Sequence, residues 1–372
     1  MGTGHTLLTI NRPAGTIIPT AIKVHSMDGS DELHLMEHPD STEEIPVLDV
    51  GPFLRGEAGA RERIGAELRA ISETVGFFYL EGHGVPQDKI DGILAASKRL
   101  HELPLEQRRR IERTDRVGYR AAEDREGLGG MEPILMSSFV TLRERPPGDA
   151  RTISSDPFRM GNHWPQELPG FREQAVDYYR TVEQVHFNLL PLWETALDLP
   201  DGYLNRFFRD PYVALSLLHY PPQGEVEQLG LQPHTDSGFV SILAQGEVPG
   251  LIVRMPSGRW RIADVRRGAF MVNTGNIMVR LTNGRFLSTK HGVINNGGVA
   301  RCSVPLFVGP DLDAMIEVLP TCQGPDNPAK YPPIRYEDYY RWFYYGGGVN
   351  EKAVGPDVKS EGRWVPERAM GE

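Results

Sequence analysis

The change of hydrophobic period near Tyr212 constrains the fold of this chain more than any other feature. Before this point apolar residues recur at helical spacing, whereas after it short apolar runs are separated by Gly, Pro and Asn. The runs are Tyr212–Tyr220, Phe239–Ala244, Leu251–Val253, Ala269–Asn273 and Cys302–Val308. Many short strands with frequent turn residues are typical of a β-sandwich or barrel. The sequence therefore predicts an α+β protein in which helices precede a mainly β core.

Three segments before Tyr212 have the spacing of amphipathic helices. The first covers Ile64–Val75, the second runs from about Gln87 to Leu103, and a longer third begins after Gly170. The apolar segments Ile45–Val50 and Phe77–Leu80 lie outside these helices and predict short buried strands. We therefore expect a helical part that contributes two strands to the protein.

The chain is expected to divide into an extension, one domain and a tail. The first 44 residues show no sustained periodicity, and a run of three glycines at 346–348 interrupts the pattern near the other end. The predicted divisions are an N-terminal extension (1–44), a single domain (45–345) and a C-terminal tail (346–372). Within the domain we expect a helical N-terminal part (45–210), a β core (211–310) and a C-terminal helical part (311–345).

Two histidines and an aspartate within the β core predict a metal site. His234 and Asp236 are two residues apart, and His291 follows in a later strand. Residues i and i+2 of a strand point the same way, so His234 and Asp236 can reach one metal ion together. Two imidazoles and one carboxylate bind one face of a metal and leave the opposite positions open, as in non-haem iron(II) oxygenases. The same His-x-Asp pattern at His38–Asp40 lies in a polar, proline-containing stretch and is not expected to bind metal.

A second i, i+2 pair, Arg301 and Ser303, predicts an anchor for a carboxylate. A guanidinium group with a hydroxyl beside it is well suited to bind that group. The turn residues 295–298 separate the strand that carries His291 from the strand that carries Arg301. We expect this turn to hold the metal ligand and the carboxylate clamp close together. The set therefore offers a metal with open positions and an anchor for an acidic co-substrate.

The bulk composition excludes several kinds of partner. The net charge is −10 and the isoelectric point is near 5.6, which argues against general affinity for nucleic acid or anionic membranes. Only two cysteines occur, so no disulfide framework is expected and a reducing compartment fits. No segment approaches the length of a membrane span, and residues 1–20 lack the pattern of a secretory signal. These features predict a soluble, cytoplasmic protein.

The chain resembles the isopenicillin N synthase-like family of iron(II)- and 2-oxoglutarate-dependent oxygenases over most of residues 45–345. The segments that carry the resemblance are Ile45–Asp49, Gly76–Val85, Leu218–Pro222, Pro233–Asp236 and Pro249–Leu251. The resemblance implies a double-stranded β-helix, a jelly roll, with flanking N-terminal helices. It implies that iron(II) is bound by His234, Asp236 and His291, and that the distal carboxylate of 2-oxoglutarate is bound by Arg301 and Ser303 with the help of Tyr220.

Three positions depart from the pattern of the family. Leu218 stands where many relatives have Asn, Gly275-Asn276 where Gly-Asp is common, and Gly292 where an Arg is frequent. None of these changes removes an expected metal ligand. They make the polar surroundings of the site differ from those of many family members, so the substrates of those members are a weak guide to the substrate of this chain.

The resemblance implies that a small molecule is hydroxylated, desaturated or cyclised. The substrate class is an amino acid, a peptide or a specialised metabolite, and 2-oxoglutarate and O2 are converted to succinate and CO2. No catalytic residue is expected beyond the metal ligands. One alternative is an iron(II) oxidase that needs no 2-oxoglutarate, in which Arg301 and Ser303 bind the substrate's own carboxylate. A second is a β-barrel that binds metal without turnover, and the oligomeric state stays open in every case.

The resemblance also indicates which segments form the substrate pocket. They are the region after Gly118-Tyr119, the residue Phe139, and the aromatic segment Tyr339–Tyr345. Arg120, Arg143 and Arg341 are the nearby cations that an acidic substrate could meet.

Overall fold

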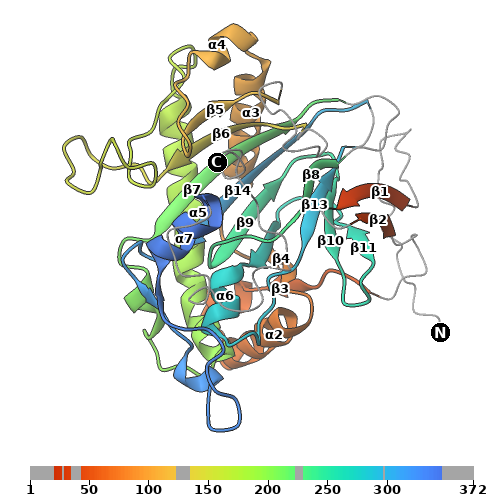
Figure 1. The fold of residues 1–372 in the computed structure, drawn as a ribbon, viewed down its shortest axis with the longest axis vertical. Helices are drawn as coiled ribbons and strands as arrows, with labels where there is room; N and C mark the ends of the chain where they lie inside the picture. The colour runs from red at the N-terminus through yellow and green to blue at the C-terminus, as the bar shows by residue number, and fades with distance from the viewer. Residues whose placement is uncertain are drawn as a thin grey trace.

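Two β-sheets form the centre of the computed structural model, which describes residues 21–26, 29–34, 43–122, 135–222, 229–295 and 298–345 (Figure 1). The larger sheet has the order β3 (Val47–Asp49), β4 (Phe77–Glu81), β12 (Phe270–Thr274), β9 (Val240–Gln245), β14 (Arg301–Gly309), β7 (Tyr212–Tyr220), β6 (Ser137–Leu142) and β5 (Gly118–Arg120). The smaller sheet has the order β11 (Trp260–Ile262), β10 (Leu251–Arg254), β13 (His291–Ile294) and β8 (Leu229–His234). All pairings within these two sheets are antiparallel except β3 with β4.

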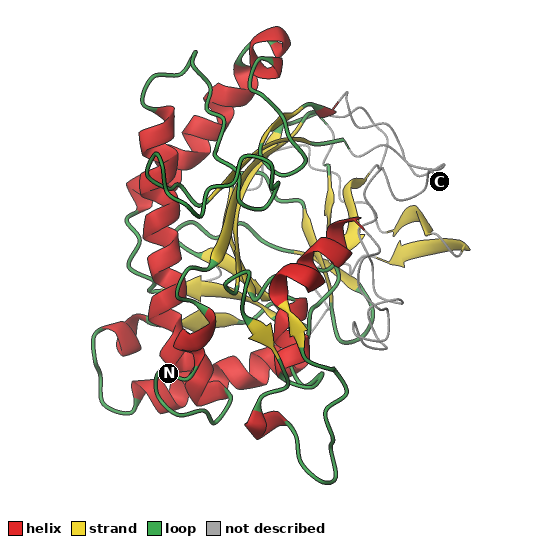
Figure 2. Cartoon of the chain, turned by 60° about the vertical axis from the view of Figure 1, so that its left-hand side comes forward, coloured by secondary structure: helices red, strands yellow, loops and turns green. Residues whose placement is uncertain are grey.

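A layer of helices covers one face of the larger sheet (Figure 2). The long helix α5 (Phe171–Ala196) packs against α2 (Ala60–Thr74) and α3 (Gln87–Glu102), and α3 and α5 both contact β14. The approach of α2 to α5 is close, because a Cβ atom on Gly65 would lie 2.6 Å from Thr195 Cγ2. The shorter helices of this part are α1 (Gly51–Leu54), α4 (Leu105–Arg109) and the 3₁₀ turn η2 (Leu204–Phe207). The apolar stripes predicted from helical spacing thus form the core between the helices and the larger sheet.

The segment after β14 returns across the opposite side of the larger sheet. It contains the strand pair β15 (Met315–Ile316) and β16 (Ile334–Arg335), the turn η3 (Pro320–Cys322), and the helix α7 (Tyr336–Tyr345), which lies in front of the sheet in Figure 1. A short helix, α6 (Asn276–Leu281), follows β12. Within the described residues, no helix combines the length and the apolar character needed to cross a membrane.

The α+β class and the mainly β core expected from the sequence are confirmed. The three predicted helices correspond to α2, α3 and α5, and the two early strands correspond to β3 and β4. The extension contains a hairpin of β1 (Ala21–Ser26) and β2 (Gly29–His34), which the sequence did not indicate. The second His-x-Asp pattern, at His38–Asp40, and the predicted tail at 346–372 lie outside the described residues.

The connection between β13 and β14 differs from a simple hairpin. The two strands are consecutive along the chain but belong to different sheets, since β13 pairs with β10 and β8 while β14 pairs with β7 and β9. The turn residues 295–298, of which 296 and 297 lie outside the described residues, therefore link the two sheets. His291, the first residue of β13, and Arg301, the first residue of β14, therefore lie on different sheets.

Candidate active site

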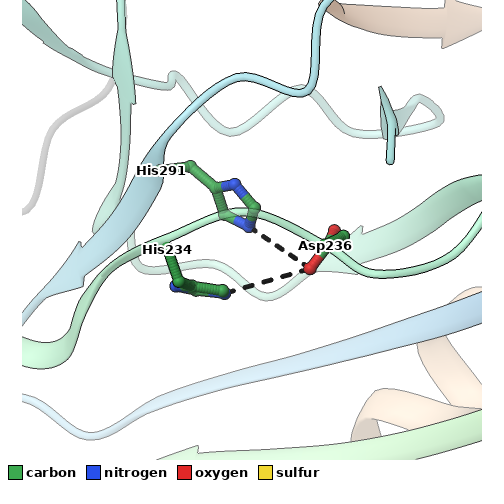
Figure 3. A group of neighbouring side chains, drawn as sticks. All are labelled: His234, Asp236 and His291. Carbon is green, nitrogen blue, oxygen red and sulfur yellow. Dashed lines mark ion pairs between the residues drawn. The ribbon is translucent and has the colours of Figure 1, made fainter. Parts of the chain in front are cut away.

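The three residues predicted as metal ligands converge in the structure (Figure 3). His234 is the last residue of β8 and pairs in register with His291, the first residue of β13. Asp236 lies in the loop just beyond β8 rather than within the strand, so the chain turns its carboxylate towards the two imidazoles. Asp236 Oδ1 is 3.9 Å from His234 Nε2 and 3.8 Å from His291 Nε2, and one ligand atom of each residue lies within 4.8 Å of the others.

Backbone carbonyls determine which nitrogen of each histidine faces the centre of the site. His234 Nδ1 is 2.8 Å from the Gln232 carbonyl oxygen, and His291 Nδ1 is 3.1 Å from the Thr289 carbonyl oxygen. A carbonyl only accepts hydrogen bonds, so each Nδ1 carries a proton and, in a neutral ring, each Nε2 presents a lone pair to the centre of the site. Burial and the neighbouring His291 lower the pKa of His234 to about 4, which keeps its ring neutral at physiological pH. Neutral imidazoles are the form that binds metal.

Two buried side chains hold Asp236 with one oxygen directed towards the histidines. Asp236 Oδ2 accepts hydrogen bonds from the Ser241 hydroxyl at 2.5 Å and from the Asn273 amide at 2.8 Å. Burial by itself raises the pKa of Asp236, but His291, His234 and these two hydrogen bonds outweigh it, so the pKa lies below its usual value. The carboxylate is therefore ionised, and Oδ1 remains for a metal. Such supporting hydrogen bonds orient metal ligands and tune their affinity.

The donor set fits iron(II). It combines two imidazole nitrogens with one carboxylate oxygen, and the described residues supply no fourth His, Cys, Asp or Glu to the cluster. Three protein ligands on one face leave positions for a bidentate co-substrate and for O2. A structural zinc site would instead have four protein ligands.

Arg301 and Ser303 form a second polar group, on β14. Arg301 Nη1 lies 3.3 Å from Ser303 Oγ, and its guanidinium carbon lies 5.0 Å from the centre of the Tyr220 ring. Arg301 is 3% exposed, its Nε has no hydrogen-bond partner among the described residues, and no carboxylate of those residues forms an ion pair with it. Burial lowers the pKa of Arg301, although the Tyr220 hydroxyl opposes this through a hydrogen bond. A buried guanidinium without an anion is costly, and a bound carboxylate would compensate it.

Tyr220 reaches this group because its strand pairs with β14. Tyr220 and Arg301 are register partners on β7 and β14, and Ser303 faces Leu218 across the same pair of strands. Tyr220 also packs with Met136 and Val293, together with the partly buried Leu218 and Leu231. The hydroxyls of Ser303 and Tyr220 therefore lie beside the guanidinium, and apolar side chains pack around the Tyr220 ring.

A cavity of about 230 Å³ opens beside the metal ligands. His234 and Asp236 belong to its wall, as do residues from both sheets and from α7. Arg301, Ser303 and Tyr220 are not among its lining residues. Leu218 and Leu231 line the cavity and also pack against Tyr220.

The expected pocket walls are only partly correct. Gly118 and Arg120 line the cavity, as do three aromatic residues of the predicted segment, Tyr340, Phe343 and Tyr344. Phe139 does not, because on β6 it is the neighbours Ser138 and Val140 that face the cavity. The ring of Phe139 lies in the helical core instead, 5.5 Å from that of Phe171. A strand alternates its side chains between two faces, and the sequence does not tell which face meets the substrate.

Two of the three arginines considered for an acidic substrate are engaged elsewhere. Arg143 forms an ion pair with Glu183, and Arg341 forms ion pairs with Asp156 and Glu337 at 2.8 and 2.7 Å. Neither lines the cavity. Arg120 does line it, together with Arg116, which the sequence did not single out.

Comparison with known proteins gives matches to two adjacent family patterns. Residues 211–310 match the family described as the 2OG-Fe(II) oxygenase superfamily. Residues 45–167 match the family described as the N-terminal region of non-haem dioxygenases in morphine synthesis.

Individual relatives match most of the chain. A 2-oxoglutarate-Fe(II) type oxidoreductase of Emericella nidulans is 31% identical over 310 residues, which cover 80% of this chain and 89% of that protein. The crystal structure of a putative 2OG-Fe(II) oxygenase family protein from Caulobacter crescentus is 26% identical, with a TM-score of 0.71, and covers 81% of this chain and 98% of that chain. A full-length Neurospora crassa protein, crystallised in complex with alpha-KG and thymine, has a TM-score of 0.71 at 23% identity, covering 82% of this chain and 97% of that chain, and supports the fold alone. The predicted jelly-roll core is thereby confirmed.

Proposed function

Because the chain belongs to the 2OG-Fe(II) oxygenase superfamily, we propose that His234, Asp236 and His291 bind its iron(II) and that Arg301 anchors its 2-oxoglutarate. The protein is an iron(II)- and 2-oxoglutarate-dependent dioxygenase that uses O2. The observation that supports the residue assignment most strongly is the convergence of two Nδ1-protonated imidazoles and one ionised carboxylate. The buried, uncompensated guanidinium of Arg301 supports the second assignment.

In this proposal the protein's own residues bind the metal and the 2-oxoglutarate, hold both in a fixed orientation and exclude water from the site. Ser241 and Asn273 hold Asp236 so that Oδ1 faces the metal position. Arg301 pairs with the distal carboxylate of 2-oxoglutarate, while Ser303 and Tyr220 add hydrogen bonds from their hydroxyls. When bound, iron(II) with 2-oxoglutarate and O2 supplies the oxidising power that breaks a substrate C–H bond. No general base is required of the protein, so we assign none.

The substrate is a small molecule that occupies the cavity beside His234 and Asp236. A volume of about 230 Å³ is of a size to accommodate a compact molecule. The proposed substrate classes are an amino acid, a peptide or a specialised metabolite. The proposed reactions are hydroxylation, desaturation or cyclisation. The expected cytoplasmic location stays a prediction. The relatives reported above are named for 2-oxoglutarate, which favours its use here over the oxidase alternative.

The experiment that tests the residue assignment measures succinate released from 2-oxoglutarate in the presence of iron(II) and O2. We expect H234A, D236A and H291A to lose both iron binding and succinate release. The matched control is H163A, since His163 pairs with Glu112 and does not line the cavity. Full succinate release by D236A, or equal loss in H163A, would contradict the assignment.

A further inference from the structure

Arg116 is a cation in the wall of the cavity that the proposed function leaves unused. It precedes β5, the edge strand of the larger sheet, and its side chain meets the aromatic residues of α7. Arg116 Nη2 donates a hydrogen bond to the Tyr340 hydroxyl at 2.7 Å. Its guanidinium carbon lies 3.6 Å from the centre of the Tyr344 ring.

No carboxylate compensates this guanidinium among the residues that the structure describes. Its contacts there include the phenols of Tyr340, Tyr344 and Tyr212 and the ring of Phe158, and its Nε is buried without a hydrogen-bond partner. Burial lowers the pKa of Arg116, but the surrounding tyrosines outweigh it and hold the pKa well above its usual value, so the charge is permanent. The phenol hydroxyls satisfy hydrogen bonds but supply no carboxylate, which leaves the guanidinium of Arg116 able to pair with one.

The charges that line the same cavity also favour an anion. Arg113 and Arg120 belong to the wall beside Arg116. The acidic residues of the lining are Asp115, which is exposed, and Asp236, which we assign to the metal. In the proposed holoenzyme the metal therefore occupies Asp236.

Tyr344 contacts both Arg116 and the loop after β8 that carries Asp236. Its ring stacks on the guanidinium, and its hydroxyl forms a hydrogen bond with Ser237, the residue after Asp236. Arg116, Tyr344 and Ser237 all line the cavity. A molecule held by one end at Arg116 can therefore lie along the Tyr344 ring with its other end beside the metal ligands.

We propose that Arg116 binds the carboxylate of a small, planar organic acid and so determines which substrate the enzyme accepts. The planar body fits because the rings of Tyr340, Phe343 and Tyr344 line the cavity. This inference rests on the proposed function, in which the metal lies at His234, Asp236 and His291. The bidentate fork of arginine recognises a carboxylate, whereas a primary amide of the same shape offers it a single neutral acceptor.

The first test compares matched probes on the unaltered protein. Benzoate, phenylacetate and cinnamate are titrated by calorimetry into anaerobic protein loaded with iron(II) and saturating 2-oxoglutarate, and each is compared with its primary amide. Saturating 2-oxoglutarate occupies the clamp at Arg301. We expect at least one carboxylate to bind about tenfold or more tightly than its amide, because hydrogen bonds to charged groups are the stronger ones. Equal binding within every pair, or no binding by any carboxylate at millimolar concentration, overturns the proposal.

The second test locates the preference at Arg116. R116Q should lose the carboxylate preference, and R116K, which keeps the charge without the planar fork, should retain part of it. The control is R335Q, because Arg335 pairs with Asp338 at the surface and should leave the preference unchanged. If Arg116 has only a structural role in packing against α7, R116Q lowers the melting temperature while the carboxylate preference persists. That result overturns the proposal. If R116Q does not fold, the proposal is tested by the carboxylate preference of R116K and by the comparison of carboxylates with amides on the unaltered protein.

A third arm separates this inference from the proposed function. Metal-free R301M lacks both the iron and the clamp, so any carboxylate preference that it retains belongs to the cavity. We expect the preference to persist in R301M, even if iron and 2-oxoglutarate prove not to bind where we propose. Loss of the preference in R301M together with its persistence in R116Q would assign the probes to Arg301 and overturn the inference.

Discussion

Replacing Arg301 with methionine should weaken 2-oxoglutarate binding while leaving the unliganded protein at least as stable. Truncating one partner of a buried, hydrogen-bonded charge pair costs about 2–5 kcal/mol. That loss corresponds to a dissociation constant raised about thirtyfold to several thousandfold. In the unliganded protein Arg301 is 3% exposed and has no ionic partner among the described residues, so methionine removes a desolvated charge and, with it, only its neutral contacts with Ser303 and Tyr220. Replacing such buried charges by apolar groups is often neutral or stabilising.

The assay has two parts, which together separate binding from folding. Calorimetric titration of 2-oxoglutarate into anaerobic, iron(II)-loaded protein gives the dissociation constant, and chemical denaturation of the metal-free protein gives the free energy of unfolding. The matched control is R341M, because Arg341 is compensated by Asp156 and Glu337. R341M should lose stability and keep its affinity for 2-oxoglutarate. A dissociation constant of R301M within about threefold of wild type would refute the role assigned to Arg301, and a marked loss of stability in metal-free R301M would refute the claim that its charge is uncompensated.

Three further predictions concern the support of the metal ligands and the buried histidines. S241A should weaken iron(II) binding about ten- to hundredfold, because it removes a hydrogen bond to Asp236 Oδ2. G275A should also weaken iron(II) binding, since its Cβ would lie 2.3 Å from the Gly238 carbonyl oxygen and displace the loop that carries Asp236. His101 and His186 have pKa values lowered by burial from 6.5 to about 3, so the unfolded chain binds more protons than the folded protein between these values. The free energy of unfolding should therefore fall as the pH decreases below about 6.5.

Each of these predictions has a control and a measurement. Anaerobic iron(II) titration compares S241A with S216A, which alters a cavity hydroxyl away from Asp236, and equal affinities would contradict the support assigned to Ser241. G161A is the control for G275A, because the nearest atom to its added Cβ is 4.0 Å away. Denaturation at several pH values should show a shallower dependence in H186L than in wild type. An unchanged slope would mean that His186 is not buried in its neutral form.

The proximity of His234 and Asp236, two of the proposed metal ligands, was predictable from local spacing, whereas His291 joins them through the pairing of β13 with β8. His234, Asp236 and His291 come together as the sequence indicated, although Asp236 lies beyond the end of β8. Arg301 and Ser303 share one strand, so their proximity also follows from spacing. Side chains two residues apart on an extended chain are neighbours whatever the surrounding fold.

The hydrogen bonds that support Asp236 were not predictable, because they depend on strand pairing. Ser241 and Asn273 are register partners on β9 and β12, and this pairing places both on one face of the sheet beneath Asp236. The face that Phe139 occupies depends in the same way on the phase of β6. Arg116 was missed because its neighbours on α7 are more than 200 positions away in the chain. The sequence carries no local signal for such contacts.

The measurement that tests the central claim most directly is an anaerobic iron(II) titration of the metal-free protein, followed by visible absorbance with and without 2-oxoglutarate. A keto acid that chelates iron(II) through its keto and carboxylate oxygens gives a weak charge-transfer band, which iron(II) alone lacks. We expect the band to appear at one iron per chain with 2-oxoglutarate present, and to be absent in D236A. Iron binding without the band would contradict the use of 2-oxoglutarate and would reassign Arg301 and Ser303 to a carboxylate of the substrate.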